Sequence, residues 1–426
     1  MKEVIIGFLG CGNVGGGVWN LLDNFRKEIA HRNDELSIRV KKVLVRDVNK
    51  ARSCAVPREL LTTDVEEVVS DPEISIVVEF LGGEQPATEY MLRALRAGKT
   101  VVTANKVALA LNWHRLQAAA QEKNVGLYYE ASVCGAIPII NVLQNSLQAN
   151  RVGHMMGIIN GTTNYILSRM YDNGEDYQDV LGDAQRLGLA EPNPAADVEG
   201  LDAAYKLSIM ASLAFHGRVP FPKVYVEGIT KLTAMDISCG KEMGYVLKLL
   251  AIAKRAGNTV QVRVHPTFLP KDHPLSSVSG SFNAVYLKGH ACQEMMLQGR
   301  GAGDMPTASA VVSDILRAAT ADIHQHPTFS NTANADPSLI FDDNWESQYF
   351  IRLAAEDKPG VLAKIAGWLA QENVSIATML QKGKMDDGRV PLIIVTHAAP
   401  EKSLRKALES FDTDVCTVDS VIRVEA

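Results

Sequence analysis

The sequence has few cysteines and no long hydrophobic run. Its 426 residues include six cysteines, which stand far apart and form no C-x-x-C pair. This distribution excludes a disulfide framework and the common zinc motifs, and it is typical of reduced thiols in the cytoplasm. No stretch approaches the ~20 apolar residues that a membrane helix needs. The first residues also lack the apolar core and the cleavage site of a signal peptide. We therefore expect a cytoplasmic protein with no membrane partner.

Positive charge is not in excess either. The 43 lysines and arginines are outnumbered by 49 acidic residues, which gives a net charge of −6. A nucleic-acid partner, which would need a basic surface, is therefore not expected. The remaining composition, 46% hydrophobic and 22% charged, is that of a globular protein rather than a disordered chain. At roughly 100–200 residues per domain, a chain of this length contains two or three domains.

The first 132 residues alternate short apolar runs with helical stretches. Five runs have the length and composition of β-strands: Val4–Leu9, Ile38–Val45, Ser75–Phe80, Gly98–Thr103 and Val125–Glu130. The first long helix is expected over Asn13–Ala30. Apolar strands separated by helices are typical of βαβ units, in which a parallel sheet is covered on both faces.

A glycine-rich loop joins the first predicted strand to the first predicted helix. It contains the pattern G-x-G-x-x-G, with glycines at Gly10, Gly12 and Gly15. In this position the glycines let the backbone approach a pyrophosphate, and the helix N-terminus supplies N–H groups. We therefore predict that residues 1–132 form a dinucleotide-binding domain of Rossmann type. The loop residues expected to bind the cofactor are Gly10, Gly12, Asn13, Val14 and Gly15.

The end of the second predicted strand bears on the choice between NADP and NAD. It reads Val45-Arg46-Asp47. The guanidinium of Arg46 could pair with the 2′-phosphate of NADP, whereas the carboxylate of Asp47 could hold the ribose hydroxyl of NAD. A solvent-facing charge pair is the third interpretation. We favour NADP(H), with Arg46 as a ligand, and leave NAD(H) open.

Two lysines stand where an ammonium group could take part in chemistry. Thr103–Lys106 follows a parallel strand at its carboxyl end, where open α/β sheets bind ligands. Lys206 ends a cluster in which four carboxylates fall within twelve positions: Glu191, Asp197, Glu199 and Asp202. Asp202 and Lys206 are four residues apart and so share a helix face. These carboxylates would repel one another unless they bind a cation, so Lys206 is well placed to donate a proton. An ordinary helix ion pair is the alternative.

The pattern changes after residue 132. Helical stretches such as Ala203–His216 stand beside alternating strands such as Val260–Val264, which predicts an α+β domain over residues 133–330. Within it, the amides of Asn160–Asn164 could cap a helix or receive a substrate carboxylate. Residues 331–347 are polar and unpatterned, which predicts a linker. Residues 348–426 have the β-α-β pattern of a small third domain.

These motifs resemble the homoserine dehydrogenase family. The segments that carry the resemblance occur in the family's order: Gly10–Gly15, Ala104–Lys106, Glu130–Gly135, Asn160–Asn164, Glu191–Lys206 and Gly301–Val311. Asp357–Leu362 and Asn373–Ile376 resemble an ACT domain. The resemblance covers nearly the whole chain. Because the glycine loop begins at residue 10, the chain resembles the monofunctional form of the family, which carries a C-terminal ACT domain.

The resemblance implies a fold and an activity. The fold is α/β, with a Rossmann-type domain, an α+β catalytic and dimerisation domain whose last helix returns to the nucleotide-binding domain, and a small C-terminal ACT domain of βαββαβ order. The activity is the reversible NAD(P)H-dependent reduction of L-aspartate 4-semialdehyde to L-homoserine in threonine and methionine biosynthesis. A homodimer or homotetramer is expected, with threonine as the expected effector at the ACT domain.

The resemblance also implies roles for individual residues. Lys206 would donate the proton to the forming alkoxide, and Lys106 would assist beside the nicotinamide. The residues implied to bind substrate are Glu191, Asp197, Asp202 and Thr162. Thr103, Lys106 and Gly303 would contact the cofactor. The residues implied to form a site for a monovalent cation, Na⁺ or K⁺, are Glu130, Val133, Gly135 and Ile137. Leu189 stands where some members carry a tyrosine, so that hydroxyl contact is absent or replaced here.

Two other interpretations remain. Cys134 follows the fifth predicted strand and could act as the thiolate of a semialdehyde dehydrogenase, although no histidine stands nearby in the sequence to activate it. A non-catalytic sensor of nucleotides and amino acids would also combine these domains. Lys106 and Lys206 argue against a sensor, because a sensor has no need of a proton donor.

Overall fold

The chain divides into two compact units in the computed structural model. The structure describes residues 3–32, 36–52, 54–322, 324, 336–381, 383 and 388–425. The first unit comprises residues 1–155, 203–224 and 282–339, and the second comprises residues 156–202, 225–281 and 340–426. Each unit therefore collects segments that are far apart in the sequence.

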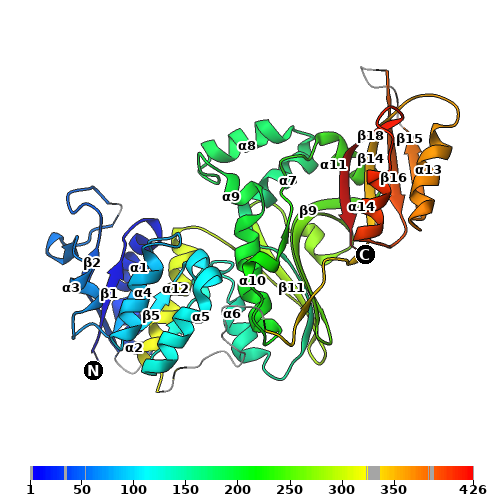
Figure 1. The fold of residues 1–426 in the computed structure, drawn as a ribbon. Coiled ribbons are helices and arrows are strands. Elements are labelled where there is room, and N and C mark those ends of the chain that lie inside the picture. The colour runs from blue at the N-terminus through cyan, green and yellow to red at the C-terminus, as the bar shows by residue number, and fades with distance from the viewer. Residues whose placement is uncertain are drawn as a thin grey trace. The chain divides into compact units, whose positions relative to one another are not determined.

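The first unit contains a parallel β-sheet (blue to cyan in Figure 1). Its strand order in the described residues is β3-β2-β1-β4-β5-β6. The strands are β1 (Glu3–Leu9), β2 (Ser37–Leu44), β3 (Leu61–Thr62), β4 (Ile76–Glu79), β5 (Thr100–Thr103) and β6 (Leu127–Tyr128). All residues of β4 and β5 are buried, as expected for strands covered on both faces. This order is that of a dinucleotide-binding sheet, and it confirms the predicted fold class.

Helices cover both faces of this sheet. They are α1 (Asn13–Asn24), α2 (Arg26–Arg32), α3 (Glu66–Val69), α4 (Ala87–Arg96), α5 (Lys106–Lys123) and α12 (Asp304–Thr320). Helix α12 comes from far along the chain, yet its apolar residues belong to the same core cluster as β1 and α1. A Cβ at Gly17 on α1 would lie 3.0 Å from the carbonyl oxygen of Asp304, so a glycine is what lets α1 and α12 approach so closely.

The first unit also contains a second group of elements. They are α6 (Ile139–Asn141), the start of β7 (Val152–Ile158), most of α10 (Leu201–Ala214), and the antiparallel pair β11 (Phe282–Gly289) and β12 (Gln293–Arg300). Short helical turns also occur at Arg58–Leu60, Glu130–Ser132, Val142–Ser146 and Phe221–Lys223.

The second unit is built on a mixed sheet. In the described residues its strand order is β9-β10-β18-β14-β16-β15. The bounds are β8 (Tyr225–Val226), β9 (Tyr245–Ala256), β10 (Thr259–Pro270), β13 (Ile340–Phe341), β14 (Glu346–Ala355), β15 (Ile376–Gln381), β16 (Val390–Thr396), β17 (Ala399–Pro400) and β18 (Cys416–Val424). The helices are α7 (Gly161–Asn173), α8 (Tyr177–Arg186), α9 (Ala195–Val198), α11 (Ala234–Glu242), α13 (Val361–Gln371) and α14 (Glu401–Glu409), with a short turn at Pro274–Ser277.

The C-terminal part of the second unit has the order β14-α13-β15-β16-α14-β18, which is the predicted βαββαβ of an ACT domain (orange and red in Figure 1). Its last strand joins it to the rest of the unit, because β18 pairs in parallel with β10. Ion pairs support this junction: Glu425 binds Arg263 at 2.5 Å, and Arg352 of β14 binds Asp236 of α11 at 2.7 Å. The ACT sheet is thus continuous with that of the unit to which it belongs.

Two predicted elements differ from the observed ones. The helix expected over Asn13–Ala30 is two helices, because α1 ends at Asn24, with Phe25 as its C-cap, and α2 begins at Arg26. The strand expected over Val125–Glu130 is reduced to β6. Glu130 turns away from it because its N–H donates to the carboxylate of Asp314, at 2.8 Å, instead of to a neighbouring strand.

The predicted linker at residues 331–347 begins outside the described residues, whereas Ile340–Phe341 forms β13 and pairs with β10. The domain boundaries stay a prediction. Every helix in the described ranges is too short or too polar to cross a membrane.

Candidate functional site

The glycine loop of the first unit forms a turn open to a ligand. Gly10 has a φ of +100° and donates its N–H to the carbonyl of Leu44, at 3.0 Å. Gly12 is the N-cap of α1, and a Cβ placed there would meet no atom within 4 Å. The first turn of α1 carries no acidic side chain to occupy its N–H groups. This end of α1 therefore fits a pyrophosphate.

A cavity of about 640 Å³ extends from this turn along the carboxyl edge of the sheet. Gly10, Gly12 and Asn13 line it, whereas Val14 packs against the apolar core and Gly15 is buried beneath Gly10 and Phe80. Of the five predicted loop ligands, three therefore face the cavity and two support the turn behind it.

The far end of the same cavity carries a cluster of charged side chains. Arg46 and Asp47 line it, as do Lys50 and Arg52. The carboxylate of Asp47 accepts the N–H of Asn49 at 2.8 Å, which is a local turn, and Arg52 donates to the backbone carbonyls of Lys50 and Asp47. Three cations therefore stand beside one carboxylate that is already hydrogen-bonded.

Lys106 is positioned by a buried carboxylate that the sequence analysis did not single out. Glu79 ends β4 and accepts the hydroxyl of Thr103, at 2.5 Å, and the N–H of Leu81, at 2.6 Å. Asn105 caps α5, and its side chain also donates to the carbonyl of Gly83, at 2.8 Å. Glu79 thus joins the strand end that carries Lys106 to the loop after β4 that lines the cofactor cavity.

Two features of this region are electrostatically unfavourable. Burial raises the pKa of Glu79 despite its hydrogen bonds. Lys106 is the first residue of α5, where a positive charge opposes the helix dipole at a cost of about 0.3–1 kcal/mol. A cation in such a place is more readily explained by function than by stability.

The carboxylates of the second unit meet on one amide. Asn160 is the N-cap of α7: its side-chain oxygen accepts the N–H of Thr163 at 2.9 Å. Its Nδ2 donates to Asp197 at 2.7 Å and to Asp202 at 2.9 Å. Of the two alternatives left open for Asn160–Asn164, helix capping is therefore present, and the same residue also brings together two predicted substrate ligands.

The other predicted substrate ligands are placed differently. Glu191 is exposed, and its backbone carbonyl accepts a hydrogen bond from the side chain of Gln185 at 3.2 Å. The hydroxyl of Thr162 donates to the carbonyl of Leu189 at 2.7 Å. Thr162 therefore fastens the segment before Glu191 to the start of α7. The side chain of Leu189 has no hydroxyl group, and because it is 37% exposed it does not pack in the core.

Lys206 is a buried lysine. It lies on α10 one turn after Asp202, and the two residues are only 8% and 5% exposed. A lysine is rarely buried unless its ammonium group is paired. Both predicted catalytic lysines, Lys106 and Lys206, belong to the first unit.

The backbone of the predicted cation loop turns sharply. Cys134 and Gly135 both have positive φ, +57° and +51°. A Cβ on Gly135 would lie 2.7 Å from the carbonyl oxygen of Gly301, so only glycine fits there. Ala136 donates its N–H to the carbonyl of Arg300 at 3.1 Å. The loop of Val133, Gly135 and Ile137 is thereby packed against the loop that leads to Gly303.

Glu130 lies at one side of this loop with both carboxylate oxygens occupied. They accept the N–H groups of Ile140 and Asn141, each at 2.8 Å. Burial, reinforced by the neighbouring Asp314, raises the pKa of Glu130 to about 7. Burial likewise raises the pKa of Asp314 to about 6. A nearby cation would relieve this pair of buried acids.

Gly303 and Cys134 complete the predicted set. Gly303 has a φ of +117° and is the N-cap of α12. Cys134 is fully buried and free of any disulfide. Its burial makes it unsuited to attack an aldehyde in solution, which argues against the thiolate mechanism.

The structure also assigns importance to residues that the sequence analysis passed over. Lys50 and Arg52 line the cofactor cavity, and Glu79 and Asn105 hold the Lys106 loop. In the sequence, the signal for Glu79 was a carboxylate at the end of an otherwise apolar strand. No comparable signal marked Lys50 and Arg52, whose neighbours in the sequence are unpatterned.

Models of known protein families match the chain in three segments. The family described as homoserine dehydrogenase matches residues 138–316, and the homoserine dehydrogenase NAD binding domain matches residues 10–130. The ACT domain matches residues 349–413.

The chain is also similar to relatives over its whole length. The homoserine dehydrogenase of Bacillus subtilis is 40% identical over 434 aligned positions, which cover 100% of this chain and 99% of the relative. The crystal structure of a homoserine dehydrogenase from Thiobacillus denitrificans is 42% identical, with a TM-score of 0.92, over 100% of this chain and 99% of that one. A hyperthermophilic archaeal homoserine dehydrogenase in complex with NADPH is 25% identical, with a TM-score of 0.63, over 74% of this chain and 98% of that one.

Proposed function

The chain belongs to the homoserine dehydrogenase family and is an NAD(P)-dependent oxidoreductase acting on a CH–OH group; from this premise we propose which residues carry out its reaction. The reaction interconverts L-aspartate 4-semialdehyde and L-homoserine in amino-acid biosynthesis. The observation that carries the proposal is the burial of Lys206 one turn after Asp202, which itself shares the amide of Asn160 with Asp197.

Lys206 is the proton donor. When bound, a reduced nicotinamide would supply hydride to the aldehyde carbon, and negative charge would then build on the aldehyde oxygen. An ammonium group stabilises that charge and delivers the proton, which leaves the alcohol of homoserine. Lys106 is the second cation beside the nicotinamide, held by the Glu79 and Asn105 hydrogen bonds.

The carboxylates receive the polar groups of the substrate. Asp197 and Asp202 are oriented by Asn160 and would hold its ammonium and hydroxyl ends together with Glu191. Glu191 is exposed, so its carboxylate is open to the substrate. Thr162 contributes through the start of α7 rather than through its hydroxyl, which already donates to Leu189.

NADP(H) is the preferred cofactor. Arg46, Lys50 and Arg52 line one end of the cavity, and the carboxylate of Asp47 is engaged by the N–H of Asn49. A 2′-phosphate would meet three cations there, whereas a ribose hydroxyl would have one carboxylate, of which one oxygen already accepts a hydrogen bond. The NADPH bound to the archaeal relative supports the same choice. NAD(H) remains usable where its concentration is high.

The loop of Glu130, Val133, Gly135 and Ile137 would hold a monovalent cation. The positive φ angles of Cys134 and Gly135 and the raised pKa of Glu130 support this assignment. Na⁺ and K⁺ both suit carbonyl ligands. The described residues contain no group of three His, Cys, Asp or Glu side chains arranged for a metal, which leaves backbone carbonyls as the ligands.

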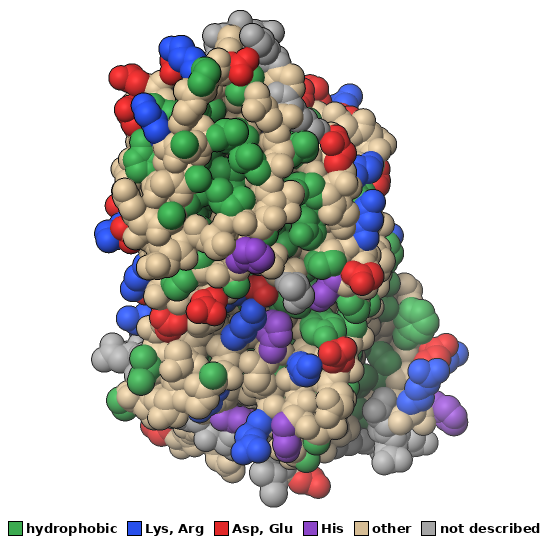
Figure 2. Space-filling view, turned by 90° about the vertical axis from the view of Figure 1, so that its right-hand side faces the viewer, with side chains coloured by type: hydrophobic (Ala, Val, Ile, Leu, Met, Phe, Trp, Pro, Cys, Tyr) green, Lys and Arg blue, Asp and Glu red, His purple; other side chains and the backbone are tan. Residues whose placement is uncertain are grey.

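The ACT domain binds an amino-acid effector and pairs with a second copy of the chain. Helix α13 exposes apolar residues, among them Leu362 at 41%, and β15 exposes Met379 at 46%. Hydrophobic side chains gather on the face of the molecule shown in Figure 2. Strand β15 also ends the sheet in the described residues, so its outer edge can pair with a second strand. A homodimer or homotetramer follows, with threonine as the expected effector. The cytoplasmic location stays a prediction.

The test is the oxidation of homoserine, followed by absorbance of the reduced nicotinamide, with NADP and NAD supplied separately. Lys206→Ala should lower kcat/KM by at least ~100-fold, the size expected for general acid–base catalysis. Lys271→Ala, which removes an exposed lysine, is the matched control. A Lys206→Ala enzyme within tenfold of the parent would contradict the assignment.

A further substitution separates the alternatives. The Cys134→Ser variant should keep most of the activity. An inactive but folded Cys134→Ser variant would favour the thiolate mechanism. If the parent protein reduces neither cofactor, the sensor interpretation takes precedence.

A further inference from the structure

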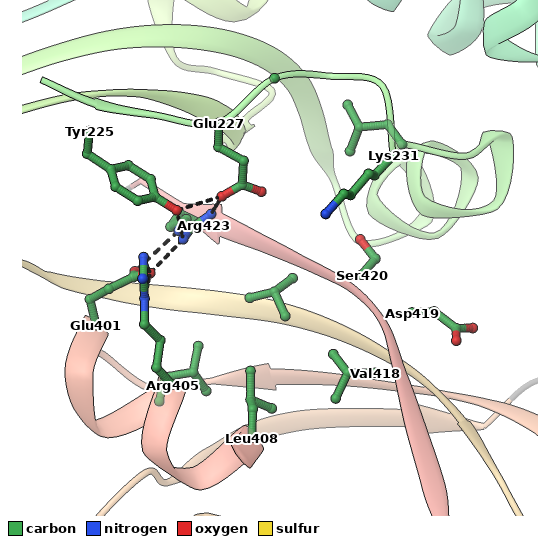
Figure 3. A pocket seen from close by; sticks show the side chains of 14 residues that line it. Tyr225, Glu227, Lys231, Glu401, Arg405, Leu408, Val418, Asp419, Ser420 and Arg423 are labelled. Atoms are coloured by element: carbon green, nitrogen blue, oxygen red, sulfur yellow. Dashed lines mark hydrogen bonds and ion pairs between the residues drawn. The ribbon is translucent and has the colours of Figure 1, made fainter. Parts of the chain in front are cut away.

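The charged groups of a second cavity already have partners. This cavity of about 360 Å³ lies in the second unit, between α14, β18 and the segment 225–232 (Figure 3). On its inner wall, Arg423 donates to Glu401 at 2.6 Å and to the hydroxyl of Tyr225 at 3.2 Å. Arg405 donates to Glu401 at 2.9 Å. These groups satisfy one another, so the wall is explained as a structural network.

Two thiols of the first unit have no such explanation. Cys11 stands between Gly10 and Gly12 of the glycine loop, and Cys54 lies beyond β2. They are 43 positions apart in the chain, yet their Sγ atoms are only 3.6 Å apart. Both are free cysteines. Neither thiol has a part in the proposed reaction.

The two thiols differ in exposure. Cys11 is half-buried and lines the cofactor cavity of about 640 Å³, so a small molecule that enters the cavity meets this residue. Cys54 is 9% exposed and lies behind it. An accessible thiol next to a buried one is the arrangement of an attacking cysteine and a resolving cysteine.

The protonation of the pair sets how fast it can react. Burial and the neighbouring Cys54 raise the pKa of Cys11 to about 12, whereas the guanidinium of Arg52 acts in the opposite direction. Only a small fraction of Cys11 is therefore thiolate at neutral pH. Because the thiolate is the attacking form, oxidation proceeds over hours rather than seconds. The pair thus persists as two thiols and is oxidised only when an oxidant is in sustained excess.

Each thiol belongs to a segment that lines one end of the cofactor cavity. Gly10 and Gly12, on either side of Cys11, line the end that fits the pyrophosphate. Cys54 stands two positions after Arg52, which lines the end proposed for the 2′-phosphate. A bond between the two sulfur atoms therefore ties the two ends of the cofactor site to each other.

This bond requires a movement of the glycine loop. A disulfide is about 2 Å long, so the sulfur atoms must approach by roughly 1.5 Å from their present contact. The loop can shift, because a Cβ on Gly12 would meet no atom within 4 Å. Gly12 is also the N-cap of α1, so the shift moves the N–H groups that face the pyrophosphate.

We propose that Cys11 and Cys54 form a reversible redox-modification site, in which a disulfide between them weakens the binding of NADP(H). The oxidant is a low-molecular-weight disulfide of the glutathione class. The proposal rests on the proposed cofactor site, because its consequence is read as a change in cofactor affinity.

The reaction has two exchange steps. The thiolate of Cys11 attacks one sulfur of the small disulfide, whose other half leaves and takes up a proton to become a thiol. The sulfur of Cys54 then attacks the Cys11 sulfur of this mixed disulfide and releases the second half, which also leaves as a thiol. The two cysteines lose two electrons and two protons, and the small disulfide gains them.

The test treats the full chain with oxidised glutathione and has two readouts. Trypsin releases residues 3–26 and 53–58, each with a single cysteine. After oxidation, mass spectrometry should find these peptides joined with the loss of two hydrogen atoms, and dithiothreitol should separate them. The affinity for NADPH, measured by titration calorimetry, should fall at least ~10-fold and recover with dithiothreitol. This is the size of one lost hydrogen bond to a charged group.

Three variants show whether the pair is responsible. Cys54→Ala removes only the buried thiol. It should bind NADPH as the untreated parent does, and after treatment it should carry glutathione on Cys11 in place of the cross-link. Cys11→Ala should keep its own NADPH affinity unchanged by the treatment. Cys292→Ala, which removes the other half-buried cysteine, should still form the cross-link.

The outcomes separate this proposal from the proposed function. A treated parent that retains glutathione on Cys11 without joined peptides would overturn the proposal, and so would joined peptides with unchanged NADPH affinity. A reduced parent that binds no NADPH would refute the proposed cofactor site and this proposal together. Binding of NADPH without oxidation of homoserine would contradict the catalytic assignments alone and leave the thiol site standing.

Discussion

Replacing Asn160 by aspartate should strongly destabilise the second unit. The substitution keeps the oxygen that caps α7, because aspartate also accepts the N–H of Thr163. It removes the N–H₂ donor that serves both Asp197 and Asp202, and it adds a third carboxylate to a site that is 5% exposed.

The magnitude follows from the geometry. The new carboxylate oxygen would take the place of Nδ2, which lies 2.7 Å from an oxygen of Asp197 and 2.9 Å from one of Asp202. Even if the side chains move apart to about 6 Å, the new charge and each of these two charges repel by about 3 kcal/mol at an effective dielectric of 20. Each lost charge-assisted hydrogen bond contributes about 1.5–3 kcal/mol. Since one carboxyl group of the triad will bind a proton to reduce the repulsion, we expect a net loss of about 3 kcal/mol at pH 8.

The pH dependence has a definite sign. Mutual repulsion raises the pKa of an acid in the folded variant above its unfolded value, so the folded state binds more protons. The destabilisation is therefore absent at low pH and appears as the pH rises through the raised pKa. Relative to the parent, Asn160→Asp should be nearly as stable at pH 5 and much less stable at pH 8.

The assay is thermal unfolding at both pH values, with the KM for homoserine as a second readout. A loss of about 3 kcal/mol lowers the midpoint by about 6–12 °C for a unit of 150–250 residues. Asn193→Asp is the matched control: it adds the same charge four residues from Asp197, but on an exposed side chain whose oxygen already accepts the N–H of Ala195. Equal unfolding midpoints for the two variants at pH 8 would refute the reasoning.

Three further predictions concern the first unit. Arg46→Ala should raise the KM for NADPH at least tenfold and leave the KM for NADH within twofold, as measured from initial rates with each cofactor. Equal effects on both KM values would contradict a contact between Arg46 and the 2′-phosphate. Because the pKa of Glu130 is raised to about 7, its contribution to stability is present below the unfolded value near 4.5 and is lost as the pH rises through 7. Added Na⁺ should therefore restore the unfolding temperature at pH 8 and have little effect at pH 5.5, and Glu130→Gln should abolish this difference. Glu79→Gln should lower kcat with little change in the KM for homoserine, since it loosens the Lys106 loop without touching the substrate carboxylates; a KM effect alone would point to a different role.

Local signals in the sequence were sufficient for much of the fold. The glycine loop was predicted correctly because three glycines at the right spacing, between an apolar strand and a helix, satisfy the whole requirement within six residues. The βαββαβ order of the ACT domain was likewise present in alternating local patterns. The break in the first helix was missed, since a change of direction at Phe25 leaves the apolar periodicity nearly intact.

The candidate site was predicted as residues rather than as an arrangement. Asp197 and Asp202 were identified from the density of carboxylates, but the residue that joins them, Asn160, lies 42 positions before Asp202. Glu191 was expected beside them and is exposed; its role in the site stays a prediction, because proximity in the sequence does not set the direction of a side chain. Glu79 was missed for the same reason, as its partner Thr103 stands on a neighbouring strand.

By itself, the sequence determined most of the secondary structure, the phosphate-binding turn and the residue types available for chemistry, because those depend on residues within one or two turns of each other. Only the tertiary structure decided which polar groups share a hydrogen bond. It placed the amide of Asn160 between two carboxylates, packed the cation loop of Gly135 against Gly301, and enclosed a cavity between two segments far apart in the chain, 225–232 and 401–423. Hydrogen bonds are short and directional, so their partners are set by packing that brings distant segments within 3 Å, and periodicity along the chain carries no record of that packing.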